Sequence, residues 1–272
     1  GDLSTGLVIK DSNDNEYVWV EVPTTIYTNS EYNTNGTPSS ADDWEKIRDC
    51  LKAYTVDYSD SDYKDTNTDG TTYSDDYKKM LKSVYTNGGF WIGRYEAGLE
   101  EGKSPRTSYV AIADSDKAVV KSNMYPYNYV TRDEAQTLAE RMNYDGVTSS
   151  LIYGVQWDLV LKYIETKNAT TKANLTSDSA SIGNYGDNLW NITNNNAKYS
   201  TDYGDSFTAC PYQKTAAEGV LLTTGADTSF SLMNIYDVAG NVWEWTKEFY
   251  DTSSPCVHRG GGYNFNGSNY PA

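Results

Sequence analysis

The residues NIYDVAGNVWEW (234–245) are the most informative stretch of the sequence. Gly240 and Asn241 stand where a tight turn would separate two apolar runs. Glu244 lies between two tryptophans, where a carboxylate is costly to bury without a partner. Two explanations are open. Glu244 forms a salt bridge in an ordinary strand, or Asp237 and Glu244 bind calcium together with backbone carbonyls of the turn.

The same stretch, followed by RGGGY (259–263), resembles the end of the formylglycine-generating enzymes, or sulfatase-modifying factors. Their pattern is G-L-Y-D-M-x-G-N-V-W-E-W and then R-G-G-S-W. Looser matches follow the family's order along the chain: EYVWVEVP (16–23), FWIGRYEAG (90–98), YNYVTRDEAQTLAERM (127–142) and SLIYGVQWDLVLKYI (150–164). The resemblance implies a C-type-lectin-like fold of the formylglycine-generating enzyme type, an α+β fold with little regular secondary structure and long loops.

The resemblance also implies the domain organisation and a metal site. Residues 1–272 form one domain with an insertion at about 28–87, and the chain stops short of the family's closing strand. The family's calcium ligands fall on matching positions of the quoted stretch. Asp237 and Glu244 take the place of side-chain ligands, and Gly240 and Val242 take the place of backbone carbonyl ligands. We therefore expect a structural calcium ion.

Catalysis does not follow from the resemblance. In the enzymes, two cysteines after the R-G-G-S-W motif hold copper as thiolates. Aligned on Arg259, those positions are Phe265 and Tyr270, which cannot bind copper(I). Related iron-dependent enzymes need several histidines, and His258 is the only one in this chain. The sequence therefore predicts a protein that binds no copper and is not an enzyme of this kind.

A second cation site is suggested by DTNTDGTTYSDD (65–76), independently of the family. Its acidic and amide residues follow the spacing of an EF-hand calcium loop, with helical patterns on both sides. The candidate ligands are Asp65, Asn67, Asp69 and Asp76. The alternative is a solvated acidic loop, since the whole chain is rich in Asp and Asn.

Local patterns predict the secondary structure without reference to any family. Strand-forming residues around a turn predict a hairpin over 6–23, and glycines bound a strand over 88–98. Apolar residues at helical spacing predict amphipathic helices over four ranges: 41–54, 74–85, 130–142 and 156–167. Ser74 is a candidate N-cap, and Thr131 with Glu134 has the spacing of a capping box. Residues 170–230 are expected to be ordered but irregular.

The composition restricts the partners. A net charge of −16 argues against nucleic acid and against an anionic membrane surface. No apolar run is long enough to insert into a membrane. Three cysteines allow at most one intrachain disulfide, and the lack of paired cysteines, with a single histidine, argues against a structural zinc site. We expect an extracellular or cell-surface protein whose export signal or anchor has been removed.

The residues YNFNGSNY (263–270) suggest what this protein does. Non-catalytic relatives of this fold include bacterial surface proteins and the variable proteins of diversity-generating retroelements, which this chain resembles. Tyrosine offers rigid contact area, whereas Asn and Ser offer adaptable hydrogen bonds. We expect a protein or other cell-surface ligand to contact seven residues: Tyr263, Asn264, Phe265, Asn266, Ser268, Asn269 and Tyr270. Two alternatives are an enzyme that uses Glu244, His258 and Arg259, and a structural pilus or envelope subunit.

Overall fold

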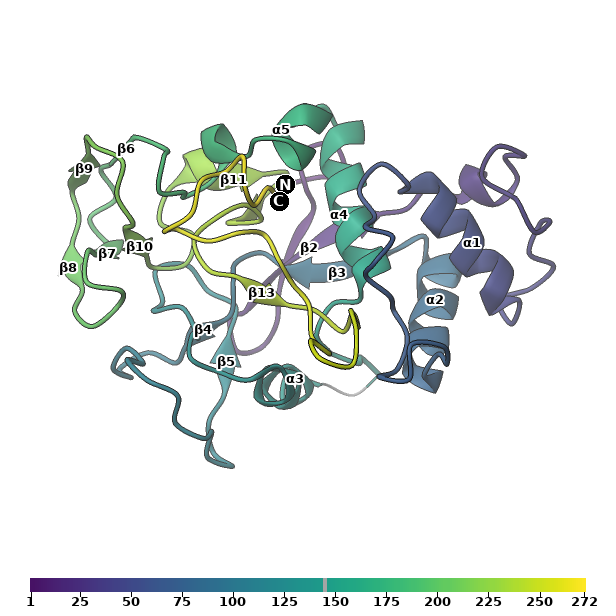
Figure 1. Cartoon of the computed structure of the whole chain (residues 1–272), viewed down its shortest axis with the longest axis horizontal. Helices are drawn as coiled ribbons and strands as arrows, with labels where there is room; N and C mark the ends of the chain where they lie inside the picture. Colours follow the sequence, from purple (N-terminus) through teal and green to yellow (C-terminus); the bar gives the residue numbers. More distant parts are fainter. Residues whose placement is uncertain (144–145) are drawn as a thin grey trace.

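A three-stranded antiparallel sheet lies at the centre of the fold, and its first two strands are the predicted hairpin. The computed structural model describes residues 1–143 and 146–272. β1 (Val8–Lys10) pairs with β2 (Glu16–Glu21), and β2 pairs along its other edge with β3 (Gly89–Gly93) (Figure 1). Val18 and Val20 are buried at alternate positions of β2, as expected for a strand with one face on the core.

Two α-helices occupy the segment between β2 and β3, after the short 3₁₀ helix η1 (Thr24–Tyr27), in the range predicted as an insertion. α1 (Trp44–Tyr54) and α2 (Asp75–Asn87) pack against each other, and both helices were predicted. The predicted N-cap is confirmed, because the Ser74 hydroxyl accepts a hydrogen bond from the backbone N–H of Tyr77. Since β2 and β3 are neighbours in the sheet, this segment leaves the sheet and returns beside its starting strand (Figure 1).

The other two predicted helices are also present. α3 (Arg132–Glu140) begins with the predicted capping box between Thr131 and Glu134. α4 (Gly154–Thr166) is buried along most of its length and packs on β2. It begins two residues earlier than predicted, because Asp65 from a distant loop accepts hydrogen bonds from its first two N–H groups.

The predicted strand over 88–98 is shorter than expected. β3 ends at Gly93, and a separate short strand, β4 (Gly98–Leu99), pairs with β5 (Ala118–Val119). Between β3 and β4 the chain turns away from the central sheet and places the side chain of Glu96 in the interior. The pairing of β3 with β2 therefore ends three residues before the buried Glu96.

The region from 170 to 230 contains short elements around its own apolar cluster, in agreement with the expected ordered but irregular segment. Trp190, Ile192 and Phe230 belong to this cluster. Its helices are α5 (Lys172–Thr176), η2 (Ala180–Ile182) and η3 (Thr228–Phe230). Its strands are β6 (Trp190–Ile192), β7 (Lys198–Ser200), β8 (Thr208–Ala209), β9 (Tyr212–Lys214) and β10 (Leu221–Leu222).

Two more two-stranded ladders complete this mixed α and β fold. β11 (Ser231–Leu232) pairs with β12 (Ile235–Tyr236), and β13 (Glu244–Trp245) pairs with β14 (His258–Arg259). Cys50, Cys210 and Cys256 are free thiols. Within the described ranges, no helix is both long enough and apolar enough to cross a membrane.

Candidate functional site

The turn between β12 and β13 is the point at which several distant segments meet. Gly240 and Asn241 both have left-handed backbone conformations, with φ of 77° and 58°. The N–H of Gly240 donates to the carbonyl of Gly260 at 2.6 Å, and the N–H of Asn241 donates to the carbonyl of Asn184 at 2.9 Å. The carbonyl of Asn241 accepts from the N–H of Tyr263 at 2.8 Å. The turn therefore fixes the start of the chain's last segment.

The side chain of Asn241 is fully buried and extends this network. Its Nδ2 donates to Glu96 Oε2 at 2.6 Å. Its Oδ1 accepts from the N–H of Leu222 and from Asn184 Nδ2, both at 3.0 Å. The amide of Asn241 thus joins three segments: β10, the segment after β3 that contains Glu96, and the loop at Asn184. An alanine in this turn could form none of these bonds.

Three carboxyl groups interact beside the turn. Burial and repulsion from Asp237 and Glu244 raise the pKa of Glu96 well above its usual value. Burial raises the pKa of Asp237 to about 7, although one of its oxygens accepts from the N–H of Gly225 at 2.7 Å. Burial and the neighbouring Asp237 raise the pKa of Glu244 to about 8. Asp237 and Glu244 were predicted from the sequence, whereas Glu96 was not, although its Y-E-A-G motif resembles part of the family's pattern.

The negative charge of these three carboxyl groups would suit a calcium ion, but their positions do not form a coordination site. Glu244 has no salt bridge within the described part of the chain, so the alternative of an ordinary ion pair finds no partner there. However, Val242 directs its N–H to Glu96 Oε1 at 3.0 Å. Among residues 1–143 and 146–272, no three acidic, histidine or cysteine side chains are grouped so that they could hold a metal.

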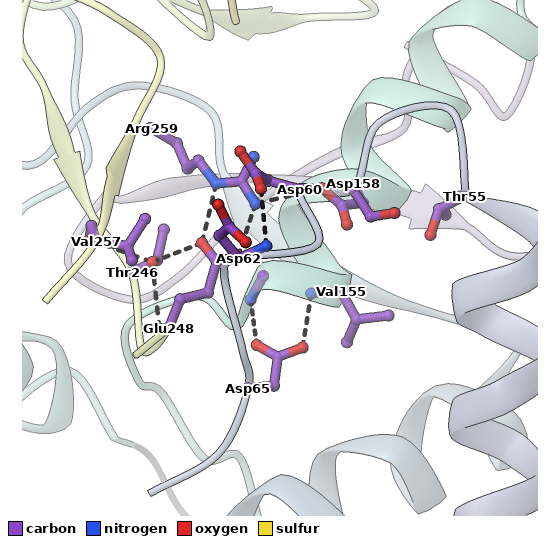
Figure 2. Close-up of polar contacts among 12 residues, drawn as sticks. Thr55, Asp60, Asp62, Asp65, Val155, Asp158, Thr246, Glu248, Val257 and Arg259 are labelled. Carbon is purple, nitrogen blue, oxygen red and sulfur yellow. Dashed lines mark hydrogen bonds and ion pairs between the residues drawn. The ribbon is translucent and has the colours of Figure 1, made fainter. Parts of the chain in front are cut away.

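A second buried cluster surrounds Arg259 (Figure 2). Its guanidinium forms two hydrogen bonds with the Glu248 carboxylate, at 2.6 and 2.9 Å, and lies 3.7 Å from Asp158 Oδ1. Its other face lies over the ring of Tyr63, 4.9 Å from the ring centre. Burial raises the pKa of Asp158 to about 8 despite the attraction of Arg259. This cluster ties β14 to α4, so Arg259 has a structural role.

The three residues of the enzyme alternative lie in different environments. Glu244 and Arg259 are partners in the β13–β14 ladder, but Arg259 binds Glu248 and Glu244 lies near Asp237. His258 is exposed, with its ring centre 4.2 Å from that of Trp243. Among the described residues, no hydrogen bond or ion pair joins these three side chains to one another.

The residues at the two copper positions belong to an aromatic cluster. The ring centres of Phe265 and Tyr270 are 4.8 Å apart. They lie 5.6 and 5.0 Å from the ring of Trp243, respectively, in edge-to-face arrangements. Trp243 is two residues from Asn241, so the aromatic cluster adjoins the hydrogen-bonded turn.

Residues 263–270, which we call the C-terminal loop, are held by their backbone. The carbonyl of Phe265 accepts from the N–H of Gly186 at 2.7 Å, and the carbonyl of Gly267 accepts from the N–H of Ser179 at 3.1 Å. The Tyr185 hydroxyl donates to the carbonyl of Tyr270 at 2.9 Å. The polypeptide is thus fixed to the segment around 179–186 at three points.

The side chains of the C-terminal loop are largely free. Asn264, Asn266, Ser268 and Asn269 are exposed, and their side chains form no hydrogen bonds with the described residues. Tyr270 is 43% exposed, whereas Tyr263 and Phe265 are half-buried. The structure therefore presents the seven predicted contact residues on one anchored loop.

Two tyrosines outside the loop were missed by the sequence analysis. Burial and the neighbouring phenol groups of Tyr129 and Tyr203 raise the pKa of Tyr263 to about 12. Both neighbours have positive φ, 51° and 61°, which is strained for a bulky residue. Tyr203 is 65% exposed. No local pattern separates them from the other tyrosines of the chain, and only the fold places them beside Tyr263.

The residues of the EF-hand-like loop are not gathered around one point. Asp65 is buried and caps α4, with its two oxygens 2.6 and 3.0 Å from backbone nitrogens. Asp69 accepts hydrogen bonds from Thr71 and Thr72 within the loop. The side chain of Asp76 is 70% exposed and pairs with Lys79, and Asn67 donates to Thr72.

Comparison with known proteins adds no relative: no family model, curated protein or solved structure matches this chain.

Proposed function

We propose that the protein is a non-catalytic binding protein that presents the C-terminal loop to a ligand. The observation that supports this most directly is that the loop's backbone is bound to the fold while its polar side chains are free. Its backbone is held by hydrogen bonds from the Tyr185 and Ser179 region, while four polar side chains contribute no hydrogen bonds to the fold. Such side chains can be replaced without loss of stability, which is what a surface that varies its ligand requires.

The chemistry of the surface suits recognition of a protein or another cell-surface ligand. Tyr263 and Tyr270 offer rigid aromatic area, and the asparagines and the serine offer donors and acceptors that still need partners. Tyr203 would extend the same surface beyond the loop, and the strain in its backbone is consistent with a binding role. Phe265 and Tyr270 carry no thiolate, which is the group that holds copper in the formylglycine-generating enzymes, in keeping with a non-catalytic role.

We further propose that the fold is C-type-lectin-like, as the resemblance to the formylglycine-generating enzymes implies. On this view the protein is exported and held at a bacterial or phage surface, like the variable proteins of diversity-generating retroelements. The Gly240-Asn241 turn supports the proposal, because this part of the matched motif joins segments that are far apart in the chain. A pilus or envelope subunit would instead bury the C-terminal loop against a neighbouring subunit.

Calcium beside this turn is part of the proposal. Asp237 and Glu244 would provide carboxylates, and the acidic Glu96 lies near both of them. The support is electrostatic. Burial together with Asp237 and Glu244 raises the pKa of Glu96, burial together with Asp237 raises that of Glu244, and no basic side chain pairs with any of the three in the described ranges. A bound divalent cation would supply the missing positive charge.

The binding proposal can be tested with a loop variant. Purified protein is screened against intact bacterial cells, extracellular-matrix proteins and a glycan array. The variant replaces the four exposed polar residues with alanine: Asn264, Asn266, Ser268 and Asn269. A control replaces Asn35 and Ser61, which are exposed in the segment between β2 and β3 and whose side chains form no hydrogen bond with the described residues.

We expect the loop variant to lose any binding that the wild type shows, with an unchanged melting temperature, and the control to bind normally. Equal binding by the loop variant and the wild type would overturn the assignment of the C-terminal loop as the contact surface.

A further inference from the structure

Tyr129 and Tyr203 lie beside Tyr263, the first residue of the C-terminal loop. The segments of Tyr129 and Tyr203 touch each other, because a Cβ placed on Gly204 would lie 3.6 Å from Asn128 Nδ2. Both phenol groups are close enough to Tyr263 to contribute to the rise of its pKa to about 12. Three segments that are far apart in the chain therefore meet at one tyrosine.

The long β4–β5 loop, residues 100–117, joins this group through Tyr109. The rings of Tyr109 and Tyr129 are in edge-to-face contact, with their centres 5.5 Å apart. Arg106 ties the loop to its neighbour by donating to the carbonyls of Val110 and Tyr129, the latter at 2.9 Å. Figure 1 shows β4, β5, β7 and β8 toward one end of the molecule and the helices α1 and α2 toward the other.

Two of these tyrosines are held in strained backbone conformations. The φ angles of Tyr129 and Tyr203 are 51° and 61°, a region that costs a bulky residue about 1–3 kcal/mol. The ring of Tyr203 is 65% exposed, so its burial does not offset this cost. Strained residues of this kind are concentrated at ligand-binding sites, which is a reason to look for a ligand here.

The exposure of the rings indicates the size of the ligand. Small molecules bind in concave sites that enclose most of their surface. Tyr109 is 70% exposed and projects into the solvent, as does Tyr203. Two cavities of 150 and 350 Å³ are lined by other residues and by none of these tyrosines. Protein interfaces, in contrast, are often centred on aromatic side chains that stand out from the free surface.

The charge around the tyrosines indicates the charge of the partner. Asp202 and Asp205 lie in the β7–β8 loop, residues 201–207. Glu218 is exposed, and a Cβ on the next residue, Gly219, would lie 3.4 Å from the ring of Tyr263. Neither the β7–β8 loop nor the C-terminal loop contains a basic residue. Opposite charges attract across an interface, and tyrosine rings also bind Arg and Lys side chains, so a basic partner is favoured.

We propose that the ligand of the C-terminal loop is a protein with a basic surface, and that Tyr109 and Tyr203 contact this protein together with Tyr263. The inference rests on the binding function proposed above for the C-terminal loop. Arg and Lys side chains of the partner would lie against the tyrosine rings and pair with Asp202 and Asp205.

The probe is a phage-displayed library of random peptides, selected on the immobilised whole chain at low ionic strength. Peptides that also bind an unrelated protein of similar negative charge are discarded, because they recognise charge alone. We expect the remaining peptides to combine Arg or Lys with apolar residues. Their affinity should fall as salt is added, since salt screens the charge pairs.

Variants then decide whether the two tyrosines form part of the surface. Tyr109→Ser and Tyr203→Asn should each weaken peptide binding by about tenfold, as expected for an aromatic contact residue. Asparagine is chosen at position 203 because it tolerates a φ of 61°. Val56→Ser is the control, because it removes an apolar side chain that is also 65% exposed, just after α1, and should have no effect.

The loop variant described above separates this inference from the proposed function. If it abolishes peptide binding while Tyr109→Ser and Tyr203→Asn bind like the wild type, the function stands and the tyrosine surface is refuted. If the tyrosine variants lose binding and the loop variant does not, the proposed function of the C-terminal loop fails.

Two other results would overturn the inference. One is the selection of only neutral or acidic peptides, which would contradict a basic partner. The other is that no selected peptide depends on either tyrosine. If Tyr203→Asn fails to fold, Tyr109→Ser still decides, because Tyr109 lies in an exposed loop.

Discussion

Replacement of Asn241 by alanine tests whether the turn between β12 and β13 holds the fold together. The substitution removes hydrogen bonds to Glu96 Oε2, to the N–H of Leu222 and to Asn184 Nδ2, all in the interior. Each buried group left without a partner costs about 1–3 kcal/mol. Alanine at a φ of 58° adds about 1 kcal/mol of backbone strain. We therefore expect a loss of about 4–10 kcal/mol, which is comparable to the whole stability of many domains.

The assay is urea unfolding followed by tryptophan fluorescence, with the midpoint and slope fitted for each variant. Asn168→Ala is the matched control, because Asn168 has a φ of 57° but is exposed and its side chain makes no hydrogen bond to the described residues. The control should lose only the strain energy, about 1 kcal/mol. If Asn241→Ala is no less stable than Asn168→Ala, the buried amide network does not carry the role assigned to it.

Three further predictions concern the same parts of the molecule. Gly261→Ala should destabilise the protein by more than about 2 kcal/mol, because Gly261 has a φ of 74° and the new Cβ would lie 2.5 Å from the carbonyl oxygen of Tyr270. Gly262→Ala, measured in the same melting experiment, should destabilise it by less than half as much. Calcium should raise the melting temperature relative to EDTA, and Asp237→Asn should abolish this difference; an equal rise in the variant would place the ion elsewhere. Burial in the folded state raises the pKa of Asp158 to about 8, so the folded protein binds a proton at this carboxyl group more tightly than the unfolded chain does. The protonated group therefore makes its full contribution to stability below about pH 4, and this contribution is lost as the pH rises toward 8. Asp158→Asn should therefore gain stability relative to the wild type between pH 5.5 and 8, and a constant difference across that range would contradict this reasoning.

Several features could be predicted from the sequence because they depend on neighbouring residues. Ser74 and Thr131 cap their helices through groups three residues ahead, and the apolar stripe of α4 is visible in the spacing of its residues. The exposure of Asn264 and Asn266 also agrees with the polar character of the segment. In each case the partner is local or is the solvent, so the pattern alone is sufficient.

The tertiary structure decided the features whose partners are distant in the chain. Glu96 accepts a hydrogen bond from Asn241, 145 residues away, and no local pattern indicates that pairing. Asp65 has the spacing of a calcium ligand, yet it caps α4 by accepting from the N–H groups of Gly154 and Val155, which are 89 and 90 positions further along the chain. The Gly-Asn turn could be recognised from its residues, but the segments it joins could not. The physical reason is that hydrogen bonds within one turn of chain follow from residue type, whereas a buried polar network depends on which segments the core brings together.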